Sequence, residues 1–476
     1  MNLVSSTATC PMKKPSSIDA RGINSPMDSL KSGIWPRSVP LWMAGVYVAL
    51  FIIRPWEELF PWLGDLRFER VYALCMIASV ALSKKRHFEM SFQALTVVLF
   101  VLSMGLSAVF AFNTSLAGDA FLEYLKLIVF YFVLIMVVRT PYQLVFIVTC
   151  YIAAMTAYLA KSQWEFFFHG QNRYDMGVYR LIGIESTFGG PNSLAMSIVV
   201  SLPMLLFLWT VRKEFSSEWP RLARKWFPIL LASYFILAIS SIILTNSRSG
   251  MLSMILFVAL VIIGRKGVFR KSAYFLLGGL MLLTIWHLAP EDNRERFMTI
   301  WNPEAGPENA RVSADGRIEG YKAGMIMFDR FPITGVGVGN FITYRVVYVD
   351  GIALEAHNLA GELLGETGVV GGISFALMVL VTLVNCYKVR TIARKNRFDP
   401  AIGVLSGLGK ACRNAVILLA FEGLFGHNLL RFNWLWLAAF SILALQSARM
   451  SMKTRGKVLN NDHSQVVLQG FRKRSH

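Results

Sequence analysis

Long runs of apolar residues, separated by shorter polar segments, fill most of this chain. A helix that crosses a membrane needs about 20 predominantly apolar residues. A helix that is apolar on every side belongs in lipid or among other helices. The pattern therefore predicts an all-α, polytopic integral membrane protein with about twelve transmembrane helices, at 39–54, 71–83, 91–112, 121–138, 141–159, 191–211, 226–245, 249–264, 272–289, 358–387, 411–428 and 433–448.

The polar segments define the rest of the organisation. Every second connection between the apolar runs is rich in Lys and Arg, which accumulate in cytoplasmic loops. This alternation predicts that both termini are cytoplasmic and that the largest connection is periplasmic. The expected parts are an N-terminal tail at 1–38, nine helices in 39–289, the large loop at 290–357, three helices in 358–448 and a basic tail at 449–476.

Composition supports a membrane protein and excludes several other classes. Only 16% of the residues are charged, against about 25% in soluble domains. The net charge of +19 follows from the basic cytoplasmic loops, so no nucleic-acid partner is expected. The five cysteines form no CxxC pair, so neither a disulfide framework nor a zinc site is expected. Residues 1–38 lack an apolar h-region, so no cleaved signal peptide is expected.

Several residues that can do chemistry fall on the predicted outer face. Arg180 precedes the sixth run, Arg248 begins the eighth, and Arg317 and His357 lie in the large loop. A cation near the membrane is costly unless it is paired or faces a ligand. Arginines without matched acids indicate an anion, and the guanidinium group suits phosphate because it donates two parallel hydrogen bonds.

Each of these residues also has a purely structural interpretation. The Thr245-Asn246-Ser247 run predicts a helix N-cap, and Arg248 behind it either contacts an anion at the helix N-terminus or extends to the membrane surface. A neutral His357 can accept a proton from an attacking hydroxyl, or it can simply cap a helix. His427 occupies a similar position at an outer helix end, and spacing alone does not separate the two histidines.

Other polar features suggest no known cofactor site. Gly335-x-Gly337-x-Gly339 lacks the preceding strand and the last glycine of a dinucleotide fingerprint, so a tight turn is predicted. The chain has no HExxH, GxSxG or Walker motif, so no metal, nucleotide or other cofactor is expected. Glu123 and Lys126 share one apolar run and are interpreted as a pair near the outer surface or as part of a ligand cavity. Two acids, Asp315 and Glu319, flank Arg317 and offer it surface ion pairs of little energetic value.

Four short motifs follow one another along the chain. They are Arg180-x-x-Gly183 with Asn192-x-Leu194-Ala195, Arg248-x-x-x-Leu252, Arg317 before Phe331-Pro332-x-x-Gly335-x-Gly337-x-Gly339-x-Phe341, and His357-Asn358 with Glu366-x-Gly368. Together, in order and spacing, they resemble the O-antigen ligase and polymerase superfamily of bacterial envelope glycan enzymes. The resemblance extends over residues 90–448 and is densest at 177–260 and 315–372. One position departs from it, because Gly361 stands where the family usually has a leucine four residues after the histidine.

The resemblance implies a reaction and assigns roles to the motif residues. Enzymes of this family transfer a glycan from an undecaprenyl-pyrophosphate carrier to an acceptor hydroxyl, at the periplasmic face of the inner membrane, without a metal. Arg180, Arg248 and Arg317 would bind the pyrophosphate, with Arg248 also stabilising charge during transfer, and His357 would be the general base. Supporting roles fall to Asn192, Gly335, Gly337, Gly339, Asn358, Glu366 and Gly368.

Two other functions remain open at this point. A polymerase of the same superfamily would extend a lipid-linked glycan, and no residue in the sequence separates it from a ligase that caps a lipid A core, a protein or a polysaccharide. An anion transporter is the second alternative. Transporters usually show repeats and broken helices near the middle of the bilayer, and the arginines here are expected at the outer end.

Overall fold

The computed structural model describes residues 38–83, 89–175, 178–216, 219–288, 291–298, 308–396 and 399–472. Helices dominate this part of the chain, with a single two-stranded antiparallel hairpin of β1 and β2. The elements are α2 (Val39–Ile53), α3 (Trp62–Asp65), α4 (Phe68–Leu82), α5 (Phe92–Val109), α6 (Thr114–Val137), α7 (Pro141–Phe168), β1 (Arg173–Asp175), β2 (Val178–Arg180), α8 (Pro191–Ser216), α9 (Arg221–Thr245), α10 (Arg248–Ile263), α11 (Val268–Leu288), α12 (Glu291–Met298), α13 (Glu308–Arg330), α14 (Phe341–Tyr348), α15 (Leu359–Lys395), α16 (Pro400–Glu422) and α17 (Phe432–Arg472).

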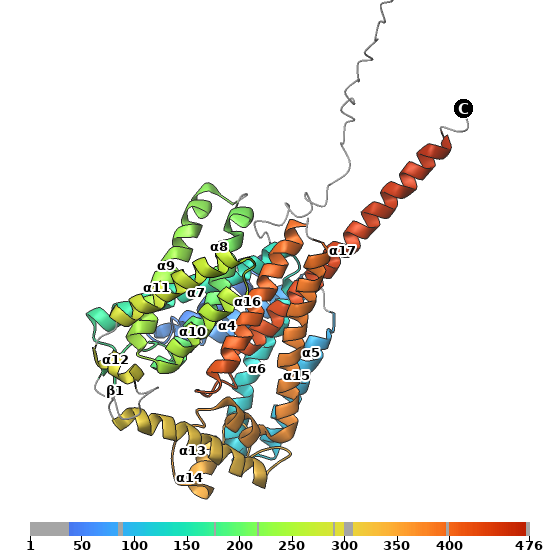
Figure 1. Cartoon of the computed structure of the whole chain (residues 1–476). Helices are drawn as coiled ribbons and strands as arrows, with labels where there is room; N and C mark the ends of the chain where they lie inside the picture. The colour runs from blue at the N-terminus through green and yellow to red at the C-terminus, as the bar shows by residue number, and fades with distance from the viewer. Residues whose placement is uncertain are drawn as a thin grey trace, which may run out of the picture.

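The long helices form a bundle, with α13 and α14 gathered at one end of it (Figure 1). Each of the twelve predicted apolar runs overlaps one of these helices. Among the described residues, eight helices are long and apolar enough to cross a membrane, and α2 and α10 are shorter apolar helices. The all-α membrane architecture is therefore confirmed, while the number of twelve crossings stays a prediction.

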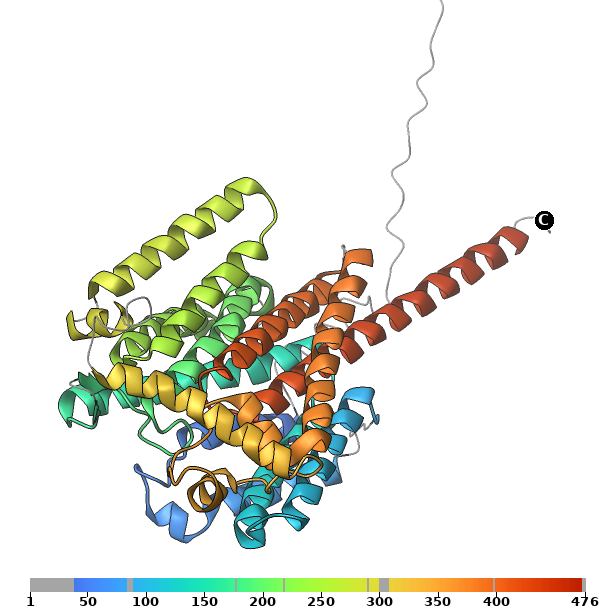
Figure 2. The ribbon, with the colours of Figure 1, turned by 60° about the horizontal axis from the view of Figure 1, so that its bottom comes forward.

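Several boundaries differ from the prediction. The segment 290–357, expected as a loop, contains the helices α12, α13 and α14. Helix α16 ends at Glu422, so His427 lies in the connection to α17 rather than in a helix. Helix α17 continues through most of the expected C-terminal tail and projects away from the bundle (Figure 2). Apolar periodicity detects buried helices but does not show where a polar segment continues a helix.

Local sequence explains where the helices begin. The Asn113 side chain accepts hydrogen bonds from the backbone at the start of α6, and Thr140 and Gln143 form a reciprocal capping box at the start of α7. Ser247 caps α10 by accepting from the Gly250 amide at 3.2 Å, as the Thr-Asn-Ser run predicts. These side chains satisfy amide groups that the first helical turn leaves without a partner.

Helix α13 crosses α15 through direct backbone contact. Gly320 and Gly324 of α13 face Gly361 and Gly365 of α15, and a Cβ atom on Gly324 would stand 2.6 Å from the Gly361 Cα. Small residues spaced four apart allow helices to approach this closely. The departure at Gly361 from the family pattern has its physical reason here, because a leucine would collide with α13. The contact holds Arg317, two turns before Gly324, over the end of the bundle.

The glycine-rich turn packs beside a break in α15. Gly368 has φ 62° and ψ −162°, which interrupts the helix. Next to this break, the carbonyls of Gly365 and Glu366 accept hydrogen bonds from the Val336 and Gly337 amides at 2.9 and 3.0 Å. The turn itself has positive φ at Gly335, Gly337 and Gly339, which glycine tolerates without strain. Gly335 therefore allows the turn to pack directly against the backbone of α15 at Glu366.

Candidate active site

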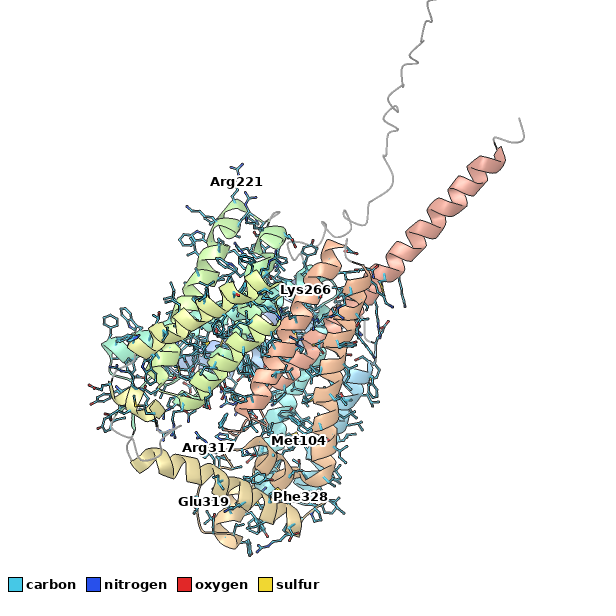
Figure 3. All side chains as sticks on the ribbon, in the orientation of Figure 1. Met104, Arg221, Lys266, Arg317, Glu319 and Phe328 are labelled. Carbon is cyan, nitrogen blue, oxygen red and sulfur yellow. The ribbon has the colours of Figure 1, made fainter. Side chains whose placement is uncertain are left out.

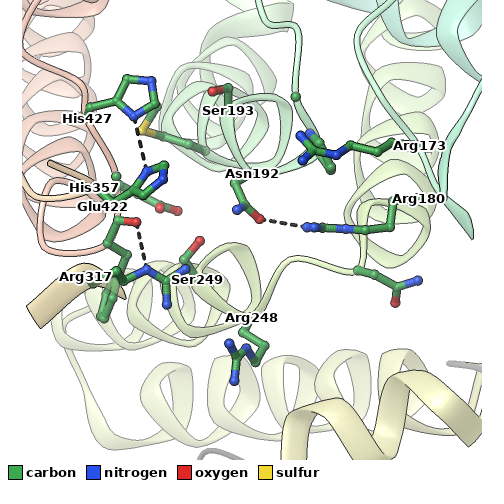
Figure 4. A pocket seen from close by; sticks show the side chains of 16 residues that line it. Arg173, Arg180, Asn192, Ser193, Arg248, Ser249, Arg317, His357, Glu422 and His427 are labelled. Atoms are coloured by element: carbon green, nitrogen blue, oxygen red, sulfur yellow. Dashed lines mark hydrogen bonds between the residues drawn. The ribbon is translucent and has the colours of Figure 1, made fainter. Parts of the chain in front are cut away.

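A cavity of about 280 Å³ lies beside α13. Its lining residues come from the hairpin, the starts of α8 and α10, α13, the start of α15 and the connection from α16 to α17. Arg180, Arg248, Arg317 and His357, which are far apart in the sequence, all face this space (Figure 4). Arg173 and His427 join them. The cavity thus collects guanidinium and imidazole groups.

Arg180 is held firmly at the wall of the cavity. Its side chain is only 4% exposed. Its Nε donates to the Thr245 carbonyl at 2.9 Å, and one terminal nitrogen donates to the Asn192 side chain at 2.8 Å. The backbone of the hairpin is also joined to the end of α9, since the Leu181 amide donates to the Leu244 carbonyl. Asn192 therefore orients Arg180 and lines the same cavity.

Arg248 and Arg317 lie close enough to repel each other electrostatically. Arg317 points from α13 toward the bundle, while Glu319 points to the opposite side of the helix (Figure 3). Its Nε donates to the Phe425 carbonyl at 3.2 Å. Burial lowers the pKa of Arg317, and Glu422 opposes that change, but a guanidinium stays protonated in proteins. Two like charges on facing helices are stabilised when an anion lies between them.

His357 and His427 form a pair. Their Nδ1 atoms are 3.4 Å apart, so one ring can donate to the other when the two tautomers differ. The end of α16 and the start of α15 bring them together, because the Leu359 amide donates to the Gly423 carbonyl and Asn358 caps α15. His357 itself has φ 47°, a left-handed backbone conformation that is uncommon outside glycine and indicates a conformation imposed by its surroundings.

Both imidazoles are neutral at pH 7. Burial lowers the pKa of His357, and the nearby charges of Arg317 and Arg345 lower it further. Burial, followed by the neighbouring His357 and Arg431, lowers the pKa of His427 to about 4. Desolvation and nearby cations both disfavour a second positive charge. A neutral imidazole has one nitrogen with a free lone pair, which is the form that a general base requires.

A buried arginine of α14 anchors the segment that precedes His357. Arg345, with no exposed surface, donates to both carboxylate oxygens of Asp350 at 2.8–3.1 Å and to the Leu354 carbonyl at 3.3 Å. The same hydrogen bonds from Arg345 lower the pKa of Asp350. Arg345 thereby holds the segment between α14 and His357 in place.

One carboxylate faces the arginines among the described residues that line the cavity. Glu422, at the end of α16, is 2% exposed. Its Oε1 atom is buried without a hydrogen-bond partner in the described part of the chain. Four arginines, Arg173, Arg180, Arg248 and Arg317, line the same cavity as this single acid. The cavity is therefore strongly cationic.

A second cavity of about 250 Å³ shares His427 with the first. Glu355, Glu362 and Glu366 line it together with Arg431. Glu362 accepts from the Leu429 amide at 3.3 Å, and Glu366 accepts from the Phe341 amide at 3.1 Å. Burial raises the pKa of Glu355. His427 thus borders both a cationic cavity and one lined by acidic side chains.

The predicted residues divide into three groups in the structure. Arg180, Asn192, Arg248, Arg317 and His357 line the cationic cavity. Gly339 and Glu366 line the second cavity, while Asn358 acts as a helix cap and Gly335, Gly337 and Gly368 shape the adjoining backbone.

Sequence reasoning missed Arg173, Glu422, Glu355 and Glu362. An available signal for Glu422 and Glu362 was their charge within apolar runs, where ionisable residues are rare and functional. Arg173 and Glu355 lie in polar loops, where nothing in the sequence distinguishes them. Glu123 and Lys126 form an exposed ion pair, as one of their two interpretations proposed. No group of three or more His, Cys, Asp or Glu side chains within the described ranges has a metal-holding arrangement.

Comparison with protein families gives one match. Residues 233–376 match the family model described as O-antigen ligase. This range contains Arg248, Arg317, His357 and Glu366, and leaves Arg180 outside. The match confirms the resemblance stated from the motifs. No curated protein matches the chain.

Proposed function

We propose that this protein, which carries a domain of the O-antigen ligase and polymerase superfamily at residues 233–376, is a metal-independent, inverting glycosyltransferase of the bacterial inner membrane. It transfers a glycan from an undecaprenyl-pyrophosphate carrier to an acceptor hydroxyl at the periplasmic face. The observation that carries the proposal is the cationic cavity, in which guanidinium groups from three separate parts of the fold meet a pair of neutral histidines.

The arginines have the chemistry required by the leaving group. A pyrophosphate diester gains negative charge as the glycosidic bond breaks, and preorganised cations stabilise that charge. The charges of Arg248 and Arg317 repel each other, and a pyrophosphate bound between them would offset that repulsion. Arg180 already uses two of its donors within the protein, so we assign it to binding and orientation. Arg248 is assigned both to binding and to stabilisation of the transition state.

The histidine pair supplies the base. When the Nδ1–H of His357 donates to Nδ1 of His427, the Nε2 atom of His357 carries a free lone pair. The acceptor hydroxyl oxygen attacks the anomeric carbon, its proton passes to this lone pair, and the bond from the anomeric carbon to the phosphate oxygen breaks. The carrier leaves as undecaprenyl pyrophosphate, and the single displacement inverts the anomeric configuration. General base catalysis of this kind contributes about 10²–10⁴-fold.

The carboxylate cavity is the proposed approach for the acceptor. Carboxylate oxygens accept hydrogen bonds from sugar hydroxyls, and Glu355, Glu362 and Glu366 line this space next to His427. An acceptor bound there would present a hydroxyl to the histidine pair, while the donor pyrophosphate stays on the opposite, cationic side. The two substrates therefore differ in the charge of the groups that bind them.

The proposal is tested with purified protein, a lipid-pyrophosphate glycan and candidate acceptors. His357→Ala should lower the rate of carrier release at least 100-fold, in line with the loss of a general base. His287→Ala, which removes an exposed histidine of α11 outside both cavities, is the matched control. Normal transfer by a well-expressed His357→Ala protein would contradict the assigned role. The product separates the two reactions, because a ligase caps an acceptor whereas a polymerase lengthens the lipid-linked glycan.

A further inference from the structure

A cavity larger than the cationic one lies at the other end of the bundle and has no part in the proposed reaction. It measures about 640 Å³, more than twice the volume of the cationic cavity. The start of α5, the end of α6, the second half of α15 and the middle of α17 enclose it. Since His357 lies just before the first turn of α15, the two cavities are separated by most of the length of that helix.

The walls of this cavity are apolar. Leu377, Leu380, Val381 and Val384 contribute one side from α15, and α17 contributes the other side through Ile442, Leu443 and Leu445. Leu380 is 56% and Val384 37% exposed in the protein alone. Apolar surface of this kind in a membrane protein is suited to hydrocarbon chains.

The floor of the cavity is rigid. The Gln93 side chain, with no exposed surface, accepts hydrogen bonds from Asn385 at 3.0 Å and Thr382 at 3.3 Å. It also donates to the Met378 carbonyl at 3.2 Å. This network joins α5 to α15 and satisfies the polar groups internally. Two members of this network, Gln93 and Asn385, line the cavity.

The rim of the cavity is basic. Arg139, Lys388, Arg449 and Lys453 line it, against the single carboxylate of Glu89 among the described lining residues. The Nη2 atom of Arg139 is buried and has no hydrogen-bond partner in the described part of the chain. A buried charged donor without an acceptor is unfavourable. This atom indicates that an anionic group belongs in the cavity.

We propose that the cavity binds one anionic phospholipid of the leaflet opposite the active site. The phosphate group would contact Arg139 and Lys388 at the rim, with Arg449 and Lys453 adding positive charge, and an acyl chain would lie along the apolar wall of α15. The basic connections predict that this end of the bundle faces the cytoplasm, where basic pockets between membrane helices bind anionic lipid head groups. A zwitterionic lipid would supply the chain but not the net negative charge.

The test measures lipid selectivity of the full-length protein in nanodiscs. Spin-labelled phosphatidylglycerol and phosphatidylcholine with identical chains are compared for the fraction of immobilised lipid. The wild-type protein should prefer phosphatidylglycerol, and Arg139→Gln with Lys388→Gln should lower that preference at least tenfold. The matched control is Arg394→Gln with Lys395→Gln, which removes two exposed cations from the end of α15 outside the cavity and should keep the preference.

A second variant tests the apolar wall without changing charge. Val384→Trp fills the cavity with a large side chain and should reduce tightly bound phosphatidylglycerol in native mass spectra of the purified protein, even if the charge variants fold poorly. Equal binding of the two lipids by the wild-type protein would indicate ordinary annular lipid and overturn the proposal. Equal loss of preference in the cavity and control variants would overturn it as well, because it would assign selectivity to overall charge.

Discussion

The substitution Gly324→Ala adds one methyl group at the crossing of α13 and α15. It should greatly slow glycan transfer although Gly324 lines neither the cationic cavity nor the cavity of acidic side chains. Gly324 has no room for a side chain, since a Cβ atom there would lie 2.6 Å from the Gly361 Cα and closer still to the Gly361 carbonyl. Ordinary van der Waals contact requires at least 3.4 Å. The Gly324→Ala substitution therefore forces the two helices apart by about 0.8 Å.

The displacement should reach Arg317 because a helix moves as a rigid rod over two turns. Arg317 and Gly324 are seven residues apart and so lie on one face of α13. A misplacement of about 1 Å in a group that contacts the reacting substrate can cost about 10²-fold in rate. The overpacking itself costs about 1–3 kcal/mol of stability, partly offset by about 1 kcal/mol from the better helix propensity of alanine.

The assay compares kcat/KM for glycan transfer and the thermal unfolding of Gly324→Ala with those of Gly316→Ala. A Cβ atom on Gly316, in the same helix, would have nothing within 4 Å. This control substitution therefore benefits from the higher helix propensity of alanine without causing a steric clash. We expect about a 100-fold loss of kcat/KM at position 324 and none at position 316. Unchanged transfer by Gly324→Ala would refute the reasoning that backbone contact positions Arg317.

The geometry of the site leads to four further predictions. The pKa of His357 is lowered, so kcat/KM should stay constant as the pH falls through about 6.5 and decline only through the lowered pKa, as a pH–rate profile will show. The pKa of His427 is also lowered, so below about pH 6.5 the unfolded chain binds a proton that the folded protein does not. The free energy of unfolding should therefore decrease as the pH is lowered from about 6.5, as a denaturant titration will show. Asp350→Asn removes the charge that pairs with buried Arg345. It should lower the free energy of unfolding by about 2 kcal/mol and slow glycan transfer. An unchanged melting curve would contradict this account. Arg248→Lys keeps the charge but loses the planar pair of donors, so KM for the lipid-pyrophosphate donor should rise about tenfold, and an unchanged KM would remove Arg248 from donor binding.

The helical membrane architecture could be predicted from the sequence because its cause is local. Apolar runs of sufficient length must satisfy their backbone hydrogen bonds internally, and a helix does this within one segment. The same locality explains the cap at Ser247, where a side chain bonds to an amide three residues later. The position of α13 could not be predicted in the same way, because this helix is polar and owes its place to contact with α15.

The site could be predicted only in part. Arg180, Arg248, Arg317 and His357 were found because motif order and topology put them on one face. The pairing of His357 with His427 was beyond the sequence, because it depends on a hydrogen bond between the end of α16 and the start of α15. Glu355 and Glu362 were missed for the same reason, since their proximity to His427 exists only in the folded chain.

The sequence by itself determined that this chain is a helical membrane protein, that it carries motifs of the O-antigen ligase and polymerase superfamily, and which arginines it has available for an anion. Only the tertiary structure decided that these arginines face a single cavity, that His427 also borders a cavity lined by acidic side chains, and that a larger cavity with basic side chains lies at the far end. The physical reason is the distance along the chain between the residues that interact. Helix formation depends on neighbours within a few residues, whereas a cavity depends on packing between segments hundreds of residues apart.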